Sequence, residues 1–356
     1  MSGLRVDVGT LRVPVLIRDT HLRIVGQGTN GVTFSVGPGR YVVTVALPGD
    51  HLVEEVVDVG RDETREVALR EAVNTADADL EDRAPLVSAR HGERPAGWQR
   101  ARMLTHAGPA LLSPARPATF GPVTESGRRR RAEVGPGDQG QSFLEVSDGV
   151  TSVALGLPSE GACLIEEDLD RGELMLSAFP ADRNARLALR YLQANDLERG
   201  GLLFSAGLRR TRPRRISSRR SAASGEVLIG CYLTLRRGYF AEVDDLIERL
   251  RGDSAWTTDV AIIEAETAAA RGRHSAAADH LLQAAGQGLP RYTAGFSILV
   301  SRMRQYAREG AVRDSLTDRQ RGLLDGLAEA YRELIPYADL TCPTTTFRNL
   351  PHLRPQ

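Results

Sequence analysis

The feature that most constrains the fold is an internal repeat in the C-terminal part of the chain. Residues 235–250 align with residues 269–284. Each segment contains an Arg-Gly step, and the two glycines, Gly238 and Gly272, lie 34 residues apart. A glycine between two amphipathic segments lets the backbone take the positive φ that a tight turn between two helices requires. The repeat therefore predicts helical hairpins that stack on one another.

A period of 34 residues with a helix-turn-helix pattern resembles the tetratricopeptide repeat. The resemblance rests on the two Arg-Gly turns and on the match of Asp245 with Asp279 in the second helices. It implies a C-terminal α-helical solenoid over residues 182–341, whose concave surface binds a peptide or a partner protein. The first-helix residues that we expect on that surface are Tyr232, Arg236 and Glu266.

The end of the helical region carries its own signals. Thr317 and Gln320 have the spacing of a capping box, in which each side chain hydrogen bonds to the backbone N–H of the other. This spacing predicts that a helix begins there. Residues 342–356 contain three prolines, and we expect them to form an extended tail.

The N-terminal part of the chain has the pattern of a β structure. Short β-branched runs alternate with Gly, Asn, Asp and Pro over residues 3–70, which is typical of a small antiparallel sandwich. The run from Pro38 to Val45, with Tyr41 and Val43 between them, resembles a strand of transthyretin-like and carboxypeptidase-regulatory-like β-sandwiches. That resemblance implies a structural or carbohydrate-facing module over residues 1–72.

The middle of the chain divides into two parts. Residues 73–140 are rich in proline and arginine, and this composition predicts a linker or an irregular region. Residues 141–181 return to alternating short runs and predict a second small β unit, which strands from the preceding stretch can complete. The fold class expected is therefore multidomain, β then α: small antiparallel β-sandwich units followed by a helical solenoid. Whether the two β units form one domain stays open.

The charge balance limits the classes of partner. The chain has 46 basic and 46 acidic residues and no net charge. Proteins that bind nucleic acid gain much of their affinity from phosphate neutralisation and usually carry a basic excess. The balance therefore argues against nucleic acid as the main partner of the whole chain.

One segment departs from this balance, because seven arginines and no aromatic residue lie between residues 209 and 220. Like charges at this density repel one another and keep a chain open. The segment is therefore interpreted as a solvated loop, with docking on an acidic protein surface, nucleic acid or anionic lipid as alternatives. The arginines available for such contacts are Arg209, Arg210, Arg212, Arg214, Arg215, Arg219 and Arg220.

No motif in the sequence predicts a catalytic residue, a cofactor or a metal ligand. The glycine pattern at residues 26–31 matches the dinucleotide fingerprint, but a strand-like run follows it where the fingerprint needs a helix. His274 and His280 are six residues apart, which is not the spacing of a helical metal pair. An enzyme that uses Cys163 or the carboxylates at residues 166–168 remains an alternative hypothesis.

The composition also indicates where such a protein works. The sequence contains arginine but no lysine, which is typical of a GC-rich bacterial genome. The three cysteines are far apart, and the first residues lack the apolar run of a secretory signal. We therefore expect a bacterial, cytoplasmic protein that has no membrane segment.

The order of modules, β units before an arginine-rich helical region, also resembles adaptors encoded beside caspase-like proteases in bacterial conflict systems. The resemblance rests on the stretches at residues 235–238 and 285–290 and implies a protease as partner. Together these features predict a non-enzymatic adaptor that binds another protein or peptide through its helical repeats. The identity of the partner and the oligomeric state stay open.

Overall fold

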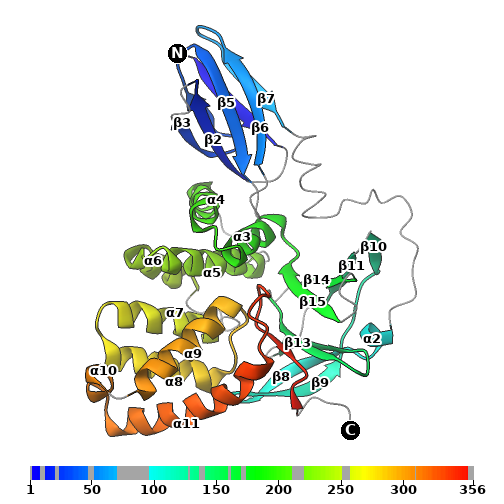
Figure 1. Ribbon diagram of the computed structural model, residues 1–356, viewed down its shortest axis with the longest axis vertical. Helices are drawn as coiled ribbons and strands as arrows, with labels where there is room; N and C mark the ends of the chain where they lie inside the picture. Colours follow the sequence, from blue (N-terminus) through cyan, green and yellow to red (C-terminus); the bar gives the residue numbers. More distant parts are fainter. Residues whose placement is uncertain are drawn as a thin grey trace. The chain divides into compact units, whose positions relative to one another are not determined.

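In the computed structural model the chain forms two compact units (Figure 1). Residues 1–88 and 190–216 make the first unit, and residues 89–189 and 217–356 make the second. The structure describes residues 2–8, 13–20, 24–46, 52–69, 96–126, 129–135, 141–158, 162–169, 174–210, 220–250, 257–308 and 310–351.

The first unit contains two sheets, with strand orders β4-β1-β7 and β3-β2-β5-β6. All the described pairs are antiparallel except β1 with β7, which is parallel and departs from the expected antiparallel pattern. The β layout expected of this region is confirmed. The strands are β1 (Gly3–Asp7), β2 (Pro14–Asp19), β3 (Ile24–Thr29), β4 (Thr33–Ser35), β5 (Gly39–Ala46), β6 (Leu52–Val59) and β7 (Thr64–Ala68).

The glycines of the apparent dinucleotide pattern have a packing role in this unit. Gly26 and Gly28 lie within β3, and the next element is β4. A Cβ at either position would lie 3.0–3.1 Å from the ring of Phe34, which is closer than ordinary van der Waals contact. The pattern therefore makes room for a buried aromatic ring, and the helix that a pyrophosphate site needs does not follow.

The second unit also contains two sheets, with strand orders β10-β11-β14-β15 and β16-β13-β12-β8-β9. Buried residues from both sheets share one core, for example Ile165 of β14 with Leu144 of β12 and Val153 of β13. The strands are β8 (Arg102–Gly108), β9 (Leu111–Pro117), β10 (Thr124–Ser126), β11 (Arg129–Val134), β12 (Gln141–Ser147), β13 (Ser152–Gly156), β14 (Cys163–Asp168), β15 (Met175–Pro180) and β16 (Thr346–Arg348). A one-turn helix, α2 (Ala96–Gln99), precedes β8.

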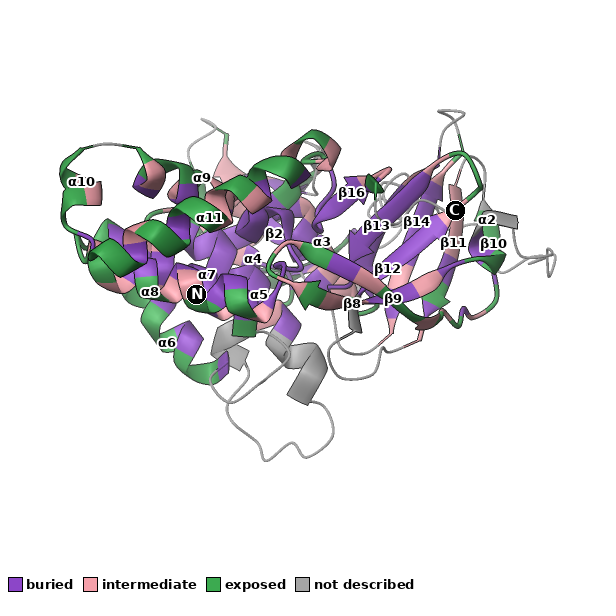
Figure 2. Ribbon diagram, turned by 90° about the horizontal axis from the view of Figure 1, so that it is seen from below, coloured by how far each residue is buried: buried purple, intermediate pink, exposed green. Residues whose placement is uncertain are grey.

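The other face of the five-stranded sheet packs against helices. Phe143, which neighbours Leu144 on β12 and so points to the opposite face, shares a core with Leu281 of α8 and Leu299 of α9. The rings of Phe347 on β16 and Phe296 on α9 meet edge to face, with centroids 5.4 Å apart. Figure 2 shows buried residues along β12, β13 and β14. The sheet is therefore an inner layer of a unit whose outer layers are the second sheet and the helices.

The prediction of an irregular linker over residues 73–140 is wrong for the described residues 102–126 and 129–134, which hold four strands. Three consecutive arginines begin β11, where Arg130 lies opposite Glu167 and Arg131 opposite Glu166 of β14. Opposite charges directly across a strand pair stabilise the pairing. The predicted extended tail is extended at residues 346–348, but these residues belong to the sheet, because β16 pairs with β13.

Eight helices of more than ten residues lie within the described chain after residue 182, which confirms the α region expected there. The division between the two units falls within α3. The helices are α3 (Arg183–Gln193), α4 (Leu197–Arg210), α5 (Arg220–Arg236), α6 (Phe240–Leu250), α7 (Thr257–Ala270), α8 (His274–Gln287), α9 (Thr293–Ala307) and α11 (Asp318–Leu334). Two short helices, α10 (Ala311–Asp314) and η2 (Ile335–Tyr337), lie beside the last of them.

The two repeat glycines end their helices in the same way. Gly238 (φ 79°) follows α5 and Gly272 (φ 72°) follows α7. The N–H of Gly238 donates to the Leu235 carbonyl at 2.9 Å, and the N–H of Gly272 donates to that of Ala269 at the same distance. In both turns the next N–H donates to a carbonyl five residues earlier, which completes a Schellman motif. The predicted hairpin turns are present at both positions.

A third turn of this kind joins α3 to α4. Asn195 takes φ 57°, its N–H donates to the Leu192 carbonyl at 3.2 Å, and the N–H of Asp196 donates to that of Tyr191 at 3.0 Å. Asparagine tolerates the left-handed conformation better than other side chains. The pattern of Arg-Gly steps does not reveal this turn, because asparagine occupies the glycine position.

The predicted capping box is confirmed at the start of α11. The Thr317 hydroxyl accepts from the Gln320 N–H at 3.2 Å, and the Gln320 side chain accepts from the Thr317 N–H at 3.0 Å. The Gln320 amide also donates to Asp279 of α8 at 2.7 Å. The cap therefore ties α11 to the preceding hairpin. Among the described helices, none has both the length and the apolar character needed to cross a bilayer.

Candidate peptide-binding groove

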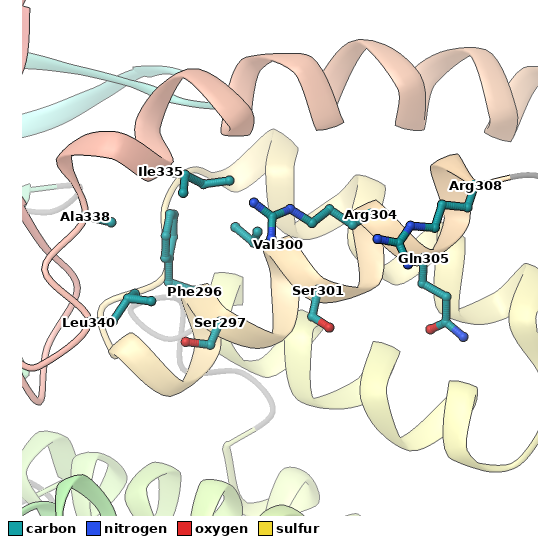
Figure 3. A pocket seen from close by; sticks show the side chains of 10 residues that line it. All are labelled: Phe296, Ser297, Val300, Ser301, Arg304, Gln305, Arg308, Ile335, Ala338 and Leu340. Carbon is teal, nitrogen blue, oxygen red and sulfur yellow. The ribbon is translucent and has the colours of Figure 1, made fainter.

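An open groove of about 460 Å³ lies along α9, between this helix and the chain that follows α11 (Figure 3). Its volume lies within the range of ligand-binding clefts. The lining residues are Phe296, Ser297, Val300, Ser301, Arg304, Gln305, Arg308, Ile335, Ala338 and Leu340.

One wall of the groove is a single stripe of α9. Phe296, Val300, Arg304 and Arg308 recur every fourth residue, and residues at this spacing lie one above another on a helix. The stripe begins with an aromatic ring and ends with two guanidinium groups. The groove therefore has an apolar end and a basic end.

The arginine side chains lean along the helix toward the apolar end. Figure 3 shows the guanidinium group of Arg304 beside Val300 and that of Arg308 turned toward Gln305. Helical side chains point toward the N-terminus of their helix, which explains this direction. The methylene groups of Arg304 cover part of the apolar floor, and its charge stays at the surface.

The opposite wall comes from Ile335 at the end of α11 and from Ala338 and Leu340 in the following turn. The side chain of Leu340 is 59% exposed, although it is large and apolar. A second groove of about 320 Å³ shares Val300, Arg304, Arg308 and Ile335 with the first. The two together form one continuous surface along α9 and α11.

The turn that carries Leu340 is held by Asp339. Its carboxylate accepts from Arg348 of β16 at 2.8 Å and from the Thr341 hydroxyl at 2.6 Å. Burial raises the pKa of Asp339, but the hydrogen bonds from Thr341 and Arg348 outweigh it and hold the pKa below its ordinary value. The carboxylate is therefore committed to the turn and to β16, and it does not line the groove.

The charged residues that line the groove are both arginines, and they lie at one end of it. Arg304 and Arg308 are exposed. Among the residues that the structure describes, no carboxylate pairs with either arginine, and the lining contains no acidic side chain. Arg332, at the edge of the second groove, does have a partner, because it forms an ion pair with Glu329.

The predicted partner-binding residues do not meet in one site. Tyr232 is fully buried, contrary to the prediction that it is exposed, because its hydroxyl donates to Asp259 at 2.6 Å in the core. Glu266 is half-buried and accepts both ends of the Arg302 guanidinium group at 2.6 Å. Arg236 is exposed. Of the three, only Arg236 is exposed as expected.

The arginine-rich segment lies largely outside the described residues. Arg212, Arg214, Arg215 and Arg219 fall within the gap at residues 211–219. The backbone of Arg209 and Arg210 ends α4, and the backbone of Arg220 begins α5, so a loop is not the conformation at these three positions.

The residues of the alternative enzyme hypothesis are occupied by structural contacts. Cys163 is fully buried in β14. Glu166 pairs with Arg131 at 3.2 Å, and Glu167 pairs with Arg130 at 2.8 Å and accepts from Trp98 Nε1 at 3.1 Å. The carboxylates of residues 166–168 lie along β14, and the ion pairs hold Glu166 and Glu167 against β11. Glu166 and Glu167 therefore do not converge on an open site.

The two histidines of α8, His274 and His280, each contact a side chain of another helix. His280 lies 3.4 Å from Glu264 of α7, and His274 contacts the Tyr306 hydroxyl at 3.3 Å. Within the described part of the chain, no group of three or more His, Cys, Asp or Glu side chains could hold a metal ion.

The sequence analysis missed the groove, although a signal for it exists. The apolar stripe of α9 that faces the core contains Leu299, Met303 and Tyr306. The stripe of Val300, Arg304 and Arg308 lies beside it, one position further along the helix. Two arginines that continue an apolar row are a pattern that a helical projection reveals, but the opposite wall depends on the tertiary fold.

Part of the chain, which includes most of the helical region, is similar to a described domain family. Residues 187–356 match the family model of the Y4kD C-terminal domain. This match covers α3 to β16 and therefore includes the groove. Comparison with curated proteins and with solved structures found no match.

Proposed function

We propose that this chain is a non-enzymatic adaptor that binds a segment of another protein in the groove along α9. The observation that carries the proposal is the open, mixed surface formed by Val300, Ile335, Arg304 and Leu340 above the buried ring of Phe296. Exposed apolar surface beside unpaired charge marks interaction sites more often than it marks inert surface.

The architecture of the helical region supports this proposal. Gly238 and Gly272 lie in the turns of two hairpins, 34 residues apart, and form the same hydrogen bonds there. This is the spacing of tetratricopeptide-like repeats. Repeats of this kind present rigid surfaces to peptides. Rigid walls favour binding because less conformational entropy is lost when the ligand docks.

The lengthwise course of the groove along α9 favours a peptide over a small metabolite. The groove runs along a helix and continues into a second hollow, so a ligand can lie lengthwise across several side-chain positions. Peptides use such grooves by inserting a few apolar anchors. The turn from Ala338 to Leu340, held by Asp339, supplies a ready-made wall for an anchor beside Phe296.

A displayed library of random twelve-residue peptides, selected on the immobilised full-length chain, tests the proposal. We expect enriched peptides that bind the native chain and not the Ser301→Trp variant. Ser301 is exposed and lines the groove, so a tryptophan there obstructs the groove without removing any buried side chain.

The matched control is Arg319→Trp. Arg319 is also exposed, but it lies on α11 and does not line the groove. This variant should keep the binding of the selected peptides. Peptides that bind both tryptophan variants equally well, or no enrichment at all, contradict the proposal. Thermal unfolding of each variant confirms that the fold is intact.

A further inference from the structure

We infer that the groove along α9 selects an acidic amphipathic peptide, with apolar side chains at its Phe296 end and carboxylates at its arginine end. The inference rests on the proposed function and adds the chemical class and the direction of the ligand. It follows from the order of residues along the stripe Phe296, Val300, Arg304 and Arg308.

The first argument is the state of the two arginines. The described surface has many arginines that already have acidic partners, for example Arg302 with Glu266 and Arg313 with Asp325. Arg304 lies on α9 and Arg308 is the C-cap residue that follows this helix, and neither has a carboxylate partner among the described residues. They are therefore available to a ligand, and guanidinium groups bind carboxylates in a planar, two-bond geometry.

The second argument is the surroundings of these arginines. The apolar side chains of Val300 and Ile335 lie next to the Arg304 guanidinium group (Figure 3). A charge beside low-dielectric surface interacts more strongly with an opposite charge than a fully solvated one does. Binding of an apolar side chain over Val300 and Ile335 excludes water from the arginine and strengthens its bond to the ligand carboxylate.

The third argument is spacing. Arg304 and Arg308 are one helical turn apart, as are Phe296 and Val300. A ligand helix or extended segment that presents anchors at a similar repeat can contact both pairs at once. The apolar pair and the basic pair follow one another along α9, so only one direction of the ligand satisfies both.

Nucleic acid fits this surface less well. Bases stack on aromatic side chains that are open to solvent, but Phe296 is only 2% exposed and its ring packs against Phe347 and Tyr331. The exposed apolar lining is aliphatic, with Leu340, Ile335 and Val300. An aliphatic surface beside paired arginines suits leucine-like anchors with neighbouring carboxylates.

The test uses three fluorescein-labelled peptides that share one helical pattern of leucines and carry glutamate, glutamine or lysine at all other positions. Fluorescence anisotropy with the full-length chain measures their affinities at 50 mM and 500 mM NaCl. We expect the glutamate peptide to bind at least about tenfold more tightly than the other two at low salt. The difference should shrink at high salt, because ions screen exposed charges.

The double variant Arg304→Glu/Arg308→Glu should reverse the order, so that the lysine peptide binds most tightly. The control Arg319→Glu changes the charge of α11 by the same amount per residue outside the groove and should leave the order unchanged. Ser301→Trp should weaken the glutamate peptide by about tenfold or more. Thermal unfolding of every variant checks that the chain is folded.

The outcomes separate the inference from the proposed function. Two outcomes overturn the inference but not the proposed adaptor function. In the first, the selected library peptides need an open groove but lack acidic residues. In the second, the glutamine peptide binds as tightly as the glutamate peptide. Absence of any groove-dependent peptide overturns both. A labelled twenty-nucleotide oligothymidine that binds through Arg304 and Arg308 while Ser301→Trp has no effect also overturns the inference.

Discussion

The hydroxyl of Tyr232 on α5 donates to Asp259 Oδ1 on α7 at 2.6 Å, inside the core of the second unit. The other carboxylate oxygen accepts from the Arg291 N–H at 3.0 Å, just before α9. Burial raises the pKa of Asp259, even though these hydrogen bonds act to lower it. One carboxylate therefore joins three elements of the helical layer that are far apart in the sequence.

The first prediction concerns this hydrogen bond. Tyr232→Phe removes the hydroxyl and leaves a buried carboxylate with one donor fewer, so the free energy of unfolding should fall by about 1–3 kcal/mol. Tyr239→Phe is the matched control, because Tyr239 is 46% exposed, and it should change the free energy by less than about 0.5 kcal/mol. Urea unfolding followed by circular dichroism gives both values; equal effects would contradict the role of Tyr232.

The second prediction concerns the glycine that lies closest to this pair. A Cβ at Gly295 of α9 would collide with the Tyr232 hydroxyl and come within 3.0 Å of Asp259 Oδ1. Gly295→Ala should therefore destabilise the chain by about 1–3 kcal/mol, because the buried pair cannot move aside. Gly326→Ala, on the exposed face of α11 with open space around it, should raise stability by about 0.5–1 kcal/mol. If both variants lose stability, the chain tolerates alanine poorly at helical glycines in general, and the result would contradict the specific role of Gly295.

The third prediction concerns the repeat turns. Gly272 takes φ 72° and has nothing near the position of a Cβ, so only backbone strain opposes a side chain there. Gly272→Ala should lower the free energy of unfolding by about 1–2 kcal/mol. Gly272→Asn should lose less, since asparagine tolerates this conformation and Asn195 adopts it in the turn between α3 and α4. Chemical denaturation of the two variants measures the order, and a larger loss for asparagine would refute the explanation.

The fourth prediction concerns pH. His106 on β8 accepts from the Leu289 N–H through Nδ1 at 3.3 Å, and its ring meets Phe143 edge to face. Burial, and then the charge of Arg291, lower the pKa of His106 to about 4. In the unfolded chain the His106 imidazole has the ordinary pKa of about 6.5. Acidification therefore lowers the free energy of the unfolded state more than that of the folded state. Stability contributed by neutral His106 is present above pH 6.5 and is lost as the pH falls toward 4.

This loss should be about 2–3 kcal/mol between pH 7 and pH 4.5. Unfolding by urea at a series of pH values measures it. His106→Gln carries no titrating group, so its stability should depend less steeply on pH over this interval, although it is lower at pH 7. The same slope for both chains would show that other groups control the acid response.

Local sequence patterns predicted the elements whose signals are short-range. The Arg-Gly repeat, the Thr317 to Gln320 spacing and the alternating runs of residues 3–70 were sufficient to predict hairpin turns, a helix start and a β region. Each pattern reports on neighbours within one turn or one strand, where backbone geometry relates spacing directly to position.

The patterns failed where a residue's role depends on a distant partner. The proline- and arginine-rich composition of residues 73–140 predicted a linker, because the carboxylates opposite Arg129, Arg130 and Arg131 come from β14, more than thirty residues later. Tyr232 was predicted to be exposed, because its acceptor Asp259 lies 27 residues further along the chain. Polar side chains look solvent-facing in a sequence unless their partners are known.

The sequence by itself determined the order of β and α regions and the position of the repeat turns, because these follow from periodicity and from the backbone freedom of glycine. Only the tertiary structure decided which face of α9 stays open. Pairing of β16 with β13 places Asn349 against Ser152, 197 residues away, and the same connection brings the turn of Leu340 opposite Val300. Contacts over such separations depend on the packing of the whole core, which no local pattern encodes.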